Sequence, residues 1–328
     1  IYSLISGFHS QRHTWLFSQI QKGAGIKDKI GRFIRYAPFC LVDYNVIYFP
    51  WNSAAITYRG LFELGKPVII SCRGSQINIR PHLPNQENYI KGLCMTMKSA
   101  TSVHCVSLDI LKEAQRYGLE IEKSVVFRPA VDPHIFVPAE AAPQNVRMRL
   151  ITIGSLIWRK GYIYLLESLK ILHDRSIDVE LNILGGGPQR ECILFTIHDL
   201  GLVGSVNLHG KVPPEAVQEH LQTADVFVLA SLSEGISNAV LEAMSCGLPV
   251  VTTDCSGMRE AVTDGVEGFV VPVRDPTAMA DALIKLAEDK ILRETMGKAG
   301  RRRVIRDFNL EDQAESFISL FQSILKGD

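Results

Sequence analysis

Glu234 and Glu242 are two carboxylates with seven residues between them, and their surroundings suggest a site for an elongated polar ligand. The apolar run Val226–Leu229 is typical of a buried parallel strand, and the residues after Ile236 have the apolar face of a helix. Glu234 is therefore expected at the carboxyl edge of a sheet, where open α/β sheets bind ligands. Glu242 should lie about 12 Å further along the axis of the helix.

A helix that begins near Ile236 would also present free backbone amides and a positive dipole end at this edge. Carboxylates accept hydrogen bonds, whereas amides donate them. Two acceptors on either side of a set of amides suit a molecule with hydroxyls at both ends and anionic charge between them.

The amino-acid composition excludes several classes of protein. The 328 residues suffice for two domains, and Lys+Arg and Asp+Glu both number 35, so no overall field would recruit nucleic acid or an acidic membrane. The seven cysteines are scattered without metal-ligand spacing, which favours reduced residues of a cytosolic protein. No apolar run approaches the ~18 residues that span a bilayer.

Strand-like and helical segments alternate from about residue 43 onward, which predicts parallel sheets covered by helices. The first half has expected strands at 46–49, 68–71, 102–105 and 125–127, and expected helices at 14–34, 53–63, 86–98 and 108–117. The second half has expected strands at 149–154, 179–184, 205–209, 226–230, 249–252 and 268–271. Its expected helices cover 161–173, 189–200, 214–222, 237–245, 257–262, 277–287, 291–305 and 310–325. A proline-rich stretch, 129–147, is the expected linker.

Three further turns should open onto the same edge as Glu234. They are 154–161 with Arg159 and Lys160, 184–190 with three glycines, and 209–211. No glycine-lysine pair is followed by Ser or Thr, so a phosphate-binding P-loop is excluded. A nicotinamide fingerprint is disfavoured because Arg190 stands where its third glycine would be.

The second half resembles the retaining, nucleotide-sugar-dependent glycosyltransferases of family four, which have the GT-B fold and a Glu-x7-Glu motif. The resemblance covers roughly residues 125 to 290 and rests on 154–161, 184–190, 224–228, 234–251 and 264–272. It implies two Rossmann-like domains facing a cleft. The acceptor-side domain would span 1–128, the linker 129–147, the donor-binding domain 148–307, and a helix crossing back to the first domain 308–328.

The resemblance also implies roles for individual residues. Lys160 would meet the donor diphosphate with help from Arg159, Glu242 would bind the ribose, and catalytic Glu234 would lie beside the transferred sugar. No metal or other cofactor is implied, because fixed cations and helix amides would stabilise the leaving phosphate. The full set of implied donor-binding residues is Arg159, Lys160, Gly187, Arg190, His209, Gly210, Lys211, Glu234, Gly235, Ile236, Ser237, Asn238 and Glu242.

The chain departs from the family pattern at three places. Ser155 stands where relatives usually have an arginine phosphate ligand, and Arg73 stands where many have a histidine near the anomeric carbon. Arg73 is nevertheless assigned to the catalytic site, where it would contact phosphate or acceptor or anchor its loop. The glycine-rich first turn of the family is missing, which predicts a first domain that lacks its first strand, turn and helix.

Several alternatives stay open. The protein could be a glycosyltransferase-like nucleotide-sugar-binding protein without turnover, or an epimerase of the same fold. Glycans and lipid-linked saccharides are both candidate acceptors, and the donor sugar, base and oligomeric state are not determined. The expected location is the cytoplasm. The first forty residues could form an ordinary amphipathic helix on the surface of the domain, or they could contact the inner face of a membrane. Cations and apolar residues mix in this stretch: Arg12, Lys22, Lys27, Lys29, Arg32, Arg35, Trp15, Phe17, Ile20 and Phe33.

Overall fold

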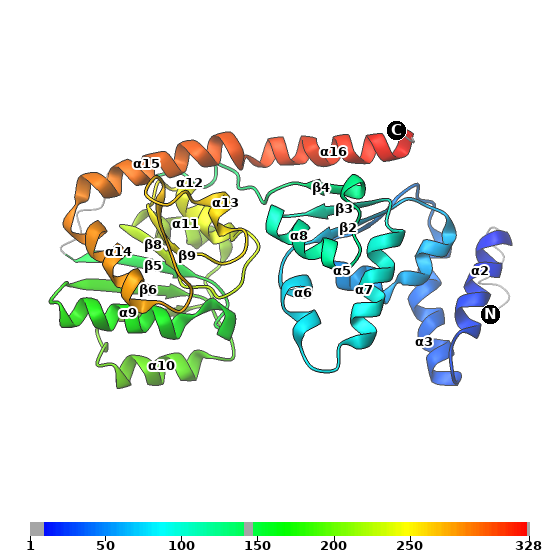
Figure 1. The fold of residues 1–328 in the computed structure, drawn as a ribbon, viewed down its shortest axis with the longest axis horizontal. Coiled ribbons are helices and arrows are strands. Elements are labelled where there is room, and N and C mark those ends of the chain that lie inside the picture. The colour runs from blue at the N-terminus through cyan, green and yellow to red at the C-terminus, as the bar shows by residue number, and fades with distance from the viewer. Residues whose placement is uncertain (1–9, 141–146, 327–328) are drawn as a thin grey trace. The chain divides into compact units, whose positions relative to one another are not determined.

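The structure is a computed structural model that describes residues 10–140 and 147–326. Contacts divide the chain into two compact units, shown with the element labels in Figure 1. The first unit runs up to Phe127 and also contains the chain from Phe317 onward, and the second runs from Arg128 to Ser316. Among the described residues, no helix is long and apolar enough to cross a membrane.

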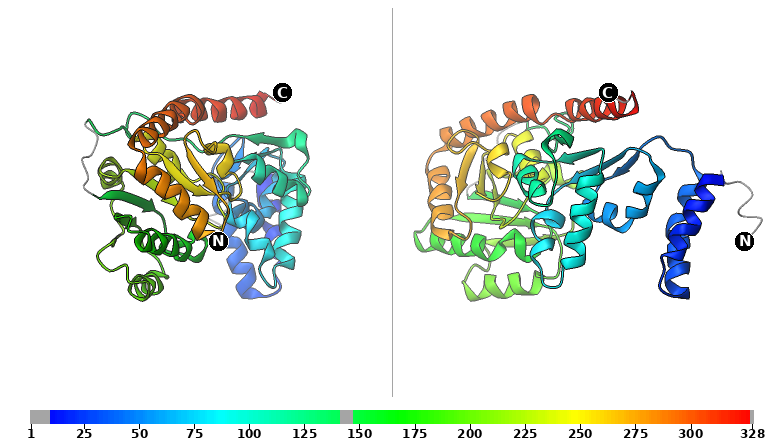
Figure 2. Two further views of the ribbon diagram at one scale, coloured as in Figure 1. Left: turned by 60° about the vertical axis from the view of Figure 1, so that its left-hand side comes forward. Right: turned by 45° about the vertical axis from the view of Figure 1, so that its right-hand side comes forward.

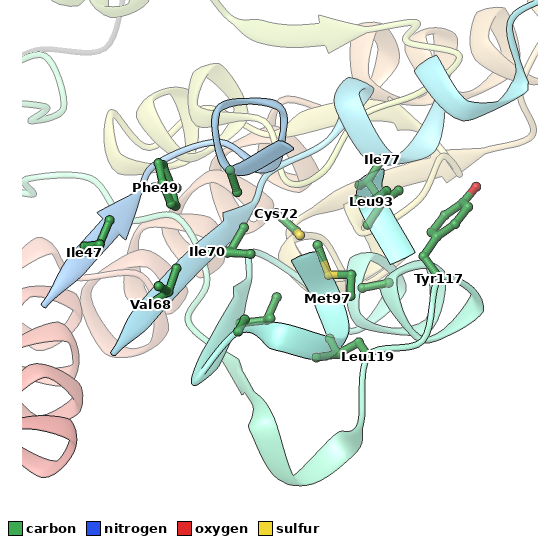
Figure 3. Packing of buried hydrophobic residues seen from close by; sticks show 14 of the residues in the cluster. Ile47, Phe49, Val68, Ile70, Cys72, Ile77, Leu93, Met97, Tyr117 and Leu119 are labelled. Atoms are coloured by element: carbon green, nitrogen blue, oxygen red, sulfur yellow. The ribbon is translucent and has the colours of Figure 1, made fainter. Parts of the chain in front are cut away.

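The first unit is built on a four-stranded parallel sheet with the order β1-β2-β3-β4. Its strands, β1 (Ile47–Phe49), β2 (Val68–Cys72), β3 (Ser102–Cys105) and β4 (Ser124–Val126), confirm the expected positions. Both faces of β2 and β3 are buried, which explains the apolar run Val68–Ile70 of β2. Figure 3 shows Val68, Ile70 and Cys72 of β2 in one cluster with Leu93 and Met97 of α7.

Helices α6 (Ser75–Asn78), α7 (Glu87–Ser99) and α8 (Leu108–Arg116) follow strands β2 and β3. Ser107 ends the loop before α8 and accepts a hydrogen bond from the Ile110 amide, so it caps that helix. Short 3₁₀ turns fill the connections at η2 (Arg80–His82) and η3 (Ile121–Lys123).

Two helices expected in the first unit are each divided in the structure. The stretch 14–34 forms α2 (Ser10–Gln21) and α3 (Ile26–Tyr36), because Gly23 and Gly25 provide the turn between them. A Cβ at Gly23 would lie 2.9 Å from the Lys29 backbone nitrogen. The stretch 53–63 forms α5 (Asn52–Thr57) and the 3₁₀ helix η1 (Arg59–Leu64), and α4 (Pro38–Leu41) is an additional short helix.

This division also changes the expected surface of the first forty residues. Trp15 is buried, and its indole donates to the Gly60 carbonyl at 3.0 Å. Ile20 packs against the core, whereas Phe17 and Phe33 are exposed. The cations and apolar residues of this stretch therefore do not form one patch.

The second unit contains a six-stranded parallel sheet with the order β10-β9-β8-β5-β6-β7. This is a doubly wound sheet whose strand order reverses beside β5. The structure confirms the expected strands to within about two residues at their ends. They are β5 (Met148–Ile153), β6 (Val179–Leu184), β7 (Val206–Gly210), β8 (Val226–Leu229), β9 (Val250–Thr253) and β10 (Gly268–Val271).

Helices cover both faces of this sheet (Figure 2). Val226 and Val228 of β8 face the cluster that contains α9 and α14, whereas Phe227 and Leu229 face the cluster that contains α12. Asp275 and Asp289 cap α14 and α15 by accepting from the amides of Ala278 and Leu292. The helices are α9 (Tyr162–Asp174), α10 (Arg190–Asp199), α11 (Pro214–Gln222), α12 (Asn238–Ser245), α13 (Met258–Ala261), α14 (Pro276–Glu288), α15 (Lys290–Asp307) and α16 (Leu310–Lys326).

The chain around the expected linker packs with the second unit. Arg128 pairs with Glu260 at 2.8 Å, and Val131 forms a parallel bridge with Asn309. Helix α16 contributes its first residues to this unit and its last residues, from Phe317, to the other.

Candidate functional site

The loops after β5, β6 and β7 are joined to one another at the carboxyl edge of the second sheet. The Gly154 amide donates to the Leu184 carbonyl at 2.9 Å, and the Gly185 amide donates to the Gly210 carbonyl at 2.7 Å. The Leu156 amide reaches the Gly186 carbonyl at 3.1 Å. These backbone hydrogen bonds hold the three loops as one rigid rim.

Two glycines let the rim pack this closely. Gly161 has a φ of +64°, and a Cβ there would lie 2.0 Å from the Ala230 carbonyl oxygen in the loop after β8. A Cβ at Gly185, where φ is +151°, would lie 1.9 Å from the Gly154 carbonyl oxygen. Any other residue at these positions would separate the loops.

Lys160 and Glu234 form an ion pair at the centre of this edge. The Lys160 ammonium donates to Oε1 of Glu234, and each side chain is only 11% exposed. The pair joins η4 (Trp158–Lys160), which follows β5, to the loop after β8. A charge pair with so little exposure is largely removed from solvent screening.

Ser231 and Thr253 fix the position of Glu234 through hydrogen bonds. The buried Ser231 hydroxyl donates to the same Oε1 at 3.0 Å, and the Thr253 hydroxyl donates to the Ser231 carbonyl. The Leu232 amide also donates to the Arg159 carbonyl at 2.7 Å, which ties the Glu234 loop to the Lys160 loop. In the described chain, no donor contacts Oε2 of Glu234, so this oxygen can accept from a ligand.

Two buried groups lie in the electrostatic field of the pair. Burial raises the pKa of the Cys255 thiol to about 12, and the charge on Glu234 adds to that rise. Burial likewise raises the pKa of Tyr162, with a further contribution from Glu234. The Tyr162 hydroxyl donates to the Gly154 carbonyl at 2.9 Å. Both groups stay protonated at neutral pH, so they add no charge to the site.

Glu242 lies on α12, whose first residue is Asn238 rather than Ile236. The segment from Glu234 to Ser237 is not helical, so the expectation of a 12 Å separation along one helix axis is wrong. Glu242 is about one turn into the helix instead. Its side chain is half-buried, and this burial raises the pKa of its carboxyl.

The loop before α12 provides amide donors. Gly235, Ile236 and Ser237 are buried, and the backbone amides from Gly235 to Asn238 donate to no other part of the described chain. Buried amides without acceptors at the start of an eight-residue helix can bind anionic or hydroxyl oxygens. They lie between the two glutamates in the sequence.

The remaining expected donor residues are more dispersed. Gly187 lies at the rim, and a Cβ there would be 2.5 Å from the Leu156 carbonyl oxygen. The stem of Lys211 packs against Gly186. Arg190 is exposed and pairs with Glu191, and His209 is hydrogen-bonded to Asn182 on the face of the sheet, beside His220. Thus Gly210 and Lys211 continue the rim, whereas the side chains of Arg190 and His209 have partners of their own.

Arg73 belongs to the first unit, where it follows β2 and is exposed. Its guanidinium donates to the Tyr48 hydroxyl at 3.4 Å, and Tyr48 shares a hydrogen bond with Ser71. Ser71 in turn bonds Nδ1 of His104, whose Nε2 contacts the Phe127 carbonyl. Both ring nitrogens of His104 are therefore occupied, and burial lowers its pKa to about 4. His104 is therefore a core residue whose polar atoms are satisfied within the first unit.

A cavity of about 820 Å³ lies at the opposite edge of the second sheet, where β5, β8 and β9 begin. Two guanidiniums line it, and both donate to backbone carbonyls: Arg301 to Phe136 and Ser245, and Arg293 to Ala287. Because these cations already hold the chain together, the carboxyl edge with its ion pair is the stronger candidate site.

Sequence reasoning did not identify Ser231, Thr253, Cys255 and Tyr162 as parts of this site. Ser231 lies just after the end of β8, and Thr253 is the last residue of β9. Ligands bind at the carboxyl ends of parallel strands, so this position in the sequence could have indicated that both residues belong to the site. Tyr162 begins a helix directly after Gly161, and in the sequence its position fits the pattern of an ordinary aromatic core residue.

Two parallel α/β units, one with a polar site at the carboxyl edge of its sheet, are the architecture of the GT-B fold. The fold of sucrose-phosphate synthase from Thermosynechococcus elongatus matches 92% of this chain and 79% of that one, with a TM-score of 0.82 and 20% identity. A structure from Anabaena in complex with UDP matches 90% of this chain and 82% of that one, with a TM-score of 0.77 and 17% identity.

The chain belongs to the glycosyl transferases group 1 family, whose model matches residues 139–303. It is 31% identical over 198 residues to the amylovoran biosynthesis glycosyltransferase of Erwinia amylovora, covering 58% of this chain and 49% of the relative. It is 35% identical over 188 residues to the GDP-mannose-dependent alpha-(1-6)-phosphatidylinositol monomannoside mannosyltransferase of Mycolicibacterium smegmatis. This match covers 53% of this chain and 49% of the relative. The chain thus spans about half the length of the curated relatives it matches.

Proposed function

We propose that this protein transfers a sugar from a nucleoside diphosphate sugar to an acceptor and retains the configuration at the anomeric carbon. The observation that carries the proposal is the Lys160–Glu234 ion pair, which lies on a rigid rim beside buried free amides. Membership of the family and the Anabaena structure in complex with UDP-glucose support it.

Lys160 would bind the diphosphate. An ammonium has three N–H donors, so Lys160 can keep its hydrogen bond to Glu234 and still donate to phosphate oxygens. Its low exposure strengthens the attraction for a developing negative charge. Arg159 would contribute a second cation, and amides from Gly235 to Asn238 would donate to the phosphate and sugar oxygens.

Glu234 would orient the transferred sugar. Lys160 and Ser231 hold Oε1, which leaves Oε2 for a sugar hydroxyl. Glu242 would accept from the ribose hydroxyls. Gly187, Gly210 and Lys211 would line the nucleoside, with His209 nearby on β7 and Arg190 at the start of α10.

The acceptor would be a glycan or a lipid-linked saccharide, in line with the amylovoran biosynthesis named for the Erwinia relative. Arg73 of the first unit would contact phosphate or acceptor. The reaction would need no metal, because Lys160, Arg159 and the amides stabilise the leaving phosphate. The proposed location is the cytoplasm, with peripheral contact at the inner face of the membrane.

A screen of UDP- and GDP-sugars tests the proposal. A donor that binds should raise the melting temperature by mass action, and incubation with extracted glycans should release its nucleoside diphosphate together with a glycosylated product. Release of the nucleoside diphosphate and free sugar without acceptor would also support transferase chemistry.

Glu242→Ala should weaken binding of this donor about tenfold or more, since a hydrogen bond to a charged group is worth roughly 1.5–3 kcal/mol. Glu167→Ala, at another half-buried helical glutamate in α9, is the matched control and should have no effect. Absence of binding to UDP- and GDP-sugars would exclude these two donor classes, and absence of binding to every nucleoside diphosphate sugar would contradict the proposal. Binding without any turnover would instead indicate a nucleotide-sugar-binding protein.

A further inference from the structure

A cavity of about 420 Å³ lies within the first unit, between α2, α3, η1 and α7. Helix α2 contacts α3 and η1, and η1 contacts α7, so the walls come from four elements that pack on one another. η1 precedes β2 and α7 precedes β3, which places the cavity near the amino ends of these strands. Arg73 follows the opposite, carboxyl end of β2. The cavity is therefore separate from the residue proposed above to meet the acceptor.

Gly60 joins three of these elements where they line the cavity. The indole of Trp15 on α2 donates to the Gly60 carbonyl at 3.0 Å, and the Gly60 amide donates to the hydroxyl of Tyr36 on α3 at 3.4 Å. A Cβ on Gly60 would lie 2.6 Å from Oε1 of Gln19. Gln19, Tyr36 and Gly60 are all buried, and all three line the cavity. Their polar groups are thus held in fixed positions.

Gln19 offers a hydrogen-bond acceptor to the cavity. The residue is only 1% exposed, and its Nε2 donates to Oε2 of Glu63 at 2.7 Å. Because a carboxylate only accepts hydrogen bonds, the amide nitrogen of Gln19 must face Glu63 and the amide oxygen must face away from it. No donor in the described residues contacts this oxygen. A buried amide oxygen without a donor favours a ligand that brings a hydroxyl.

Three cations also line the cavity: Lys22, Arg32 and Arg59. Glu63 is the one carboxylate among the described lining residues, and Lys22 already pairs with it at 2.6 Å. Arg32 reaches Asp28 through Nε at 3.4 Å, which leaves its two terminal nitrogens without a partner in the described chain. Arg59 has no carboxylate partner within residues 10–140 and 147–326. Two guanidiniums therefore have donors to spare, and a guanidinium binds phosphate through paired N–H groups.

We propose that this cavity binds a small phosphorylated polyol of the size of a hexose phosphate, at a site separate from the donor and acceptor sites. Arg32 and Arg59 would bind the phosphate, and Gln19 would accept from a hydroxyl. Phe62 and Met95, which also line the cavity, would contact the carbon skeleton. A bare anion would leave the Gln19 oxygen without a donor, and a neutral sugar would leave both guanidiniums without an acceptor. The proposal does not depend on the transfer reaction.

Calorimetric titration of the whole chain with glucose 6-phosphate and mannose 6-phosphate tests the cavity. We expect at least one of them to bind at a single site, about tenfold or more tighter than glucose or inorganic phosphate. Arg59→Ala should weaken this binding about fivefold, as expected for an exposed cation that contacts phosphate. Gln19→Met should weaken binding of the hexose phosphate about tenfold and leave that of inorganic phosphate unchanged, because only a hydroxyl contact is lost.

Arg35→Ala is the matched control for Arg59→Ala. Arg35 is also an exposed arginine of the first unit, but it lies outside the lining of the cavity. This variant should bind the hexose phosphate like the unmodified chain. Because both side chains are exposed, neither substitution should disturb folding.

Lys160→Met separates this cavity from the proposed donor site. It should keep its affinity for the hexose phosphate, whether or not the unmodified chain binds a nucleotide, so failure of one proposal would not imply failure of the other. Loss of hexose phosphate binding in Lys160→Met would assign the ligand to the donor site and overturn the proposal. So would no binding of either hexose phosphate, equal loss in Arg35→Ala and Arg59→Ala, or equally tight binding of inorganic phosphate.

Discussion

The Ser231 hydroxyl donates to Oε1 of Glu234 at 3.0 Å, and this same oxygen accepts from the Lys160 ammonium. One carboxylate oxygen is thus fixed by two donors, and the other is left for a ligand. Ser231 is itself held by Thr253, at the end of the adjacent strand β9. The orientation of Glu234 is therefore determined by the ends of two neighbouring strands and by the loop after a third.

Ser231→Ala should affect the sugar part of the donor selectively. Without the hydroxyl, Glu234 loses one of the two donors that orient it, so affinity for a nucleotide sugar should fall about tenfold. Affinity for the corresponding nucleoside diphosphate should barely change, because Lys160 is still present. Calorimetric titration of both ligands measures the difference. Ser168→Ala, which removes an equally buried helical hydroxyl in α9, should change neither affinity.

Gly161→Ala should destabilise the second unit more than an ordinary glycine substitution does. Gly161 and Gly201 have nearly the same positive φ, +64° and +67°, but only Gly161 has a carbonyl within 2.0 Å of the added Cβ. Gly201→Ala should cost about 1–2 kcal/mol for the left-handed backbone. Gly161→Ala should cost about 1–3 kcal/mol more for overpacking. Urea unfolding measures the loss in free energy of unfolding for each variant. Equal losses for Gly161→Ala and Gly201→Ala would mean that the loops around Gly161 can move apart without cost.

His104 should make the first unit less stable in acid. Its pKa is about 4 in the folded protein against 6.5 ordinarily, so the unfolded chain binds the proton more readily between these values. Stability from this group is complete above pH 6.5 and is lost as the pH falls toward 4, by about 3 kcal/mol in total. His104→Gln should flatten this part of the pH dependence of unfolding. An unchanged slope in the variant would assign the acid sensitivity to other groups.

Removal of divalent metals should not reduce activity. The proposed stabilisation of the leaving diphosphate comes from Lys160, Arg159 and backbone amides, and it needs no bound ion. Sugar transfer or donor hydrolysis in excess EDTA should therefore equal the rate without it. A loss of turnover that Mg²⁺ or Mn²⁺ restores would contradict this part of the proposal.

The central strands of the second sheet could be predicted because they are short runs buried on both faces. The apolar run of β8 is a clear case. The stretch 14–34 was harder, because its apolar period continues across Gly23 and Gly25 and conceals the turn between two helices. The separation of Glu234 and Glu242 was misjudged, because the segment from Glu234 to Ser237 lies in the loop before α12 and not in the helix.

The site could be predicted only in part. Parallel strands bring Lys160 and Glu234 to one edge, and this is visible in the sequence. Lys160 and Glu234 are 74 residues apart, and they can pair because Gly161 lets their two loops pack closely. No local sequence pattern indicates this contact. Ser231 and Thr253 are common residue types at strand ends, and only their hydrogen bonds distinguish them.

The most direct test of the account is the affinity of Lys160→Met for nucleoside diphosphates. Lys170→Met is the control, because Lys170 is also ion-paired, with Asp174, but lies on the outer surface of α9. Titration with UDP and GDP should show tight binding of one of them to the unmodified chain and to Lys170→Met, and about 10- to 150-fold weaker binding to Lys160→Met. Since removal of Lys160 leaves Glu234 unpaired, the double variant Lys160→Met/Glu234→Gln should show the same loss in a stably folded protein. Equal affinity in Lys160→Met and Lys170→Met would contradict the assignment of this edge as the diphosphate site.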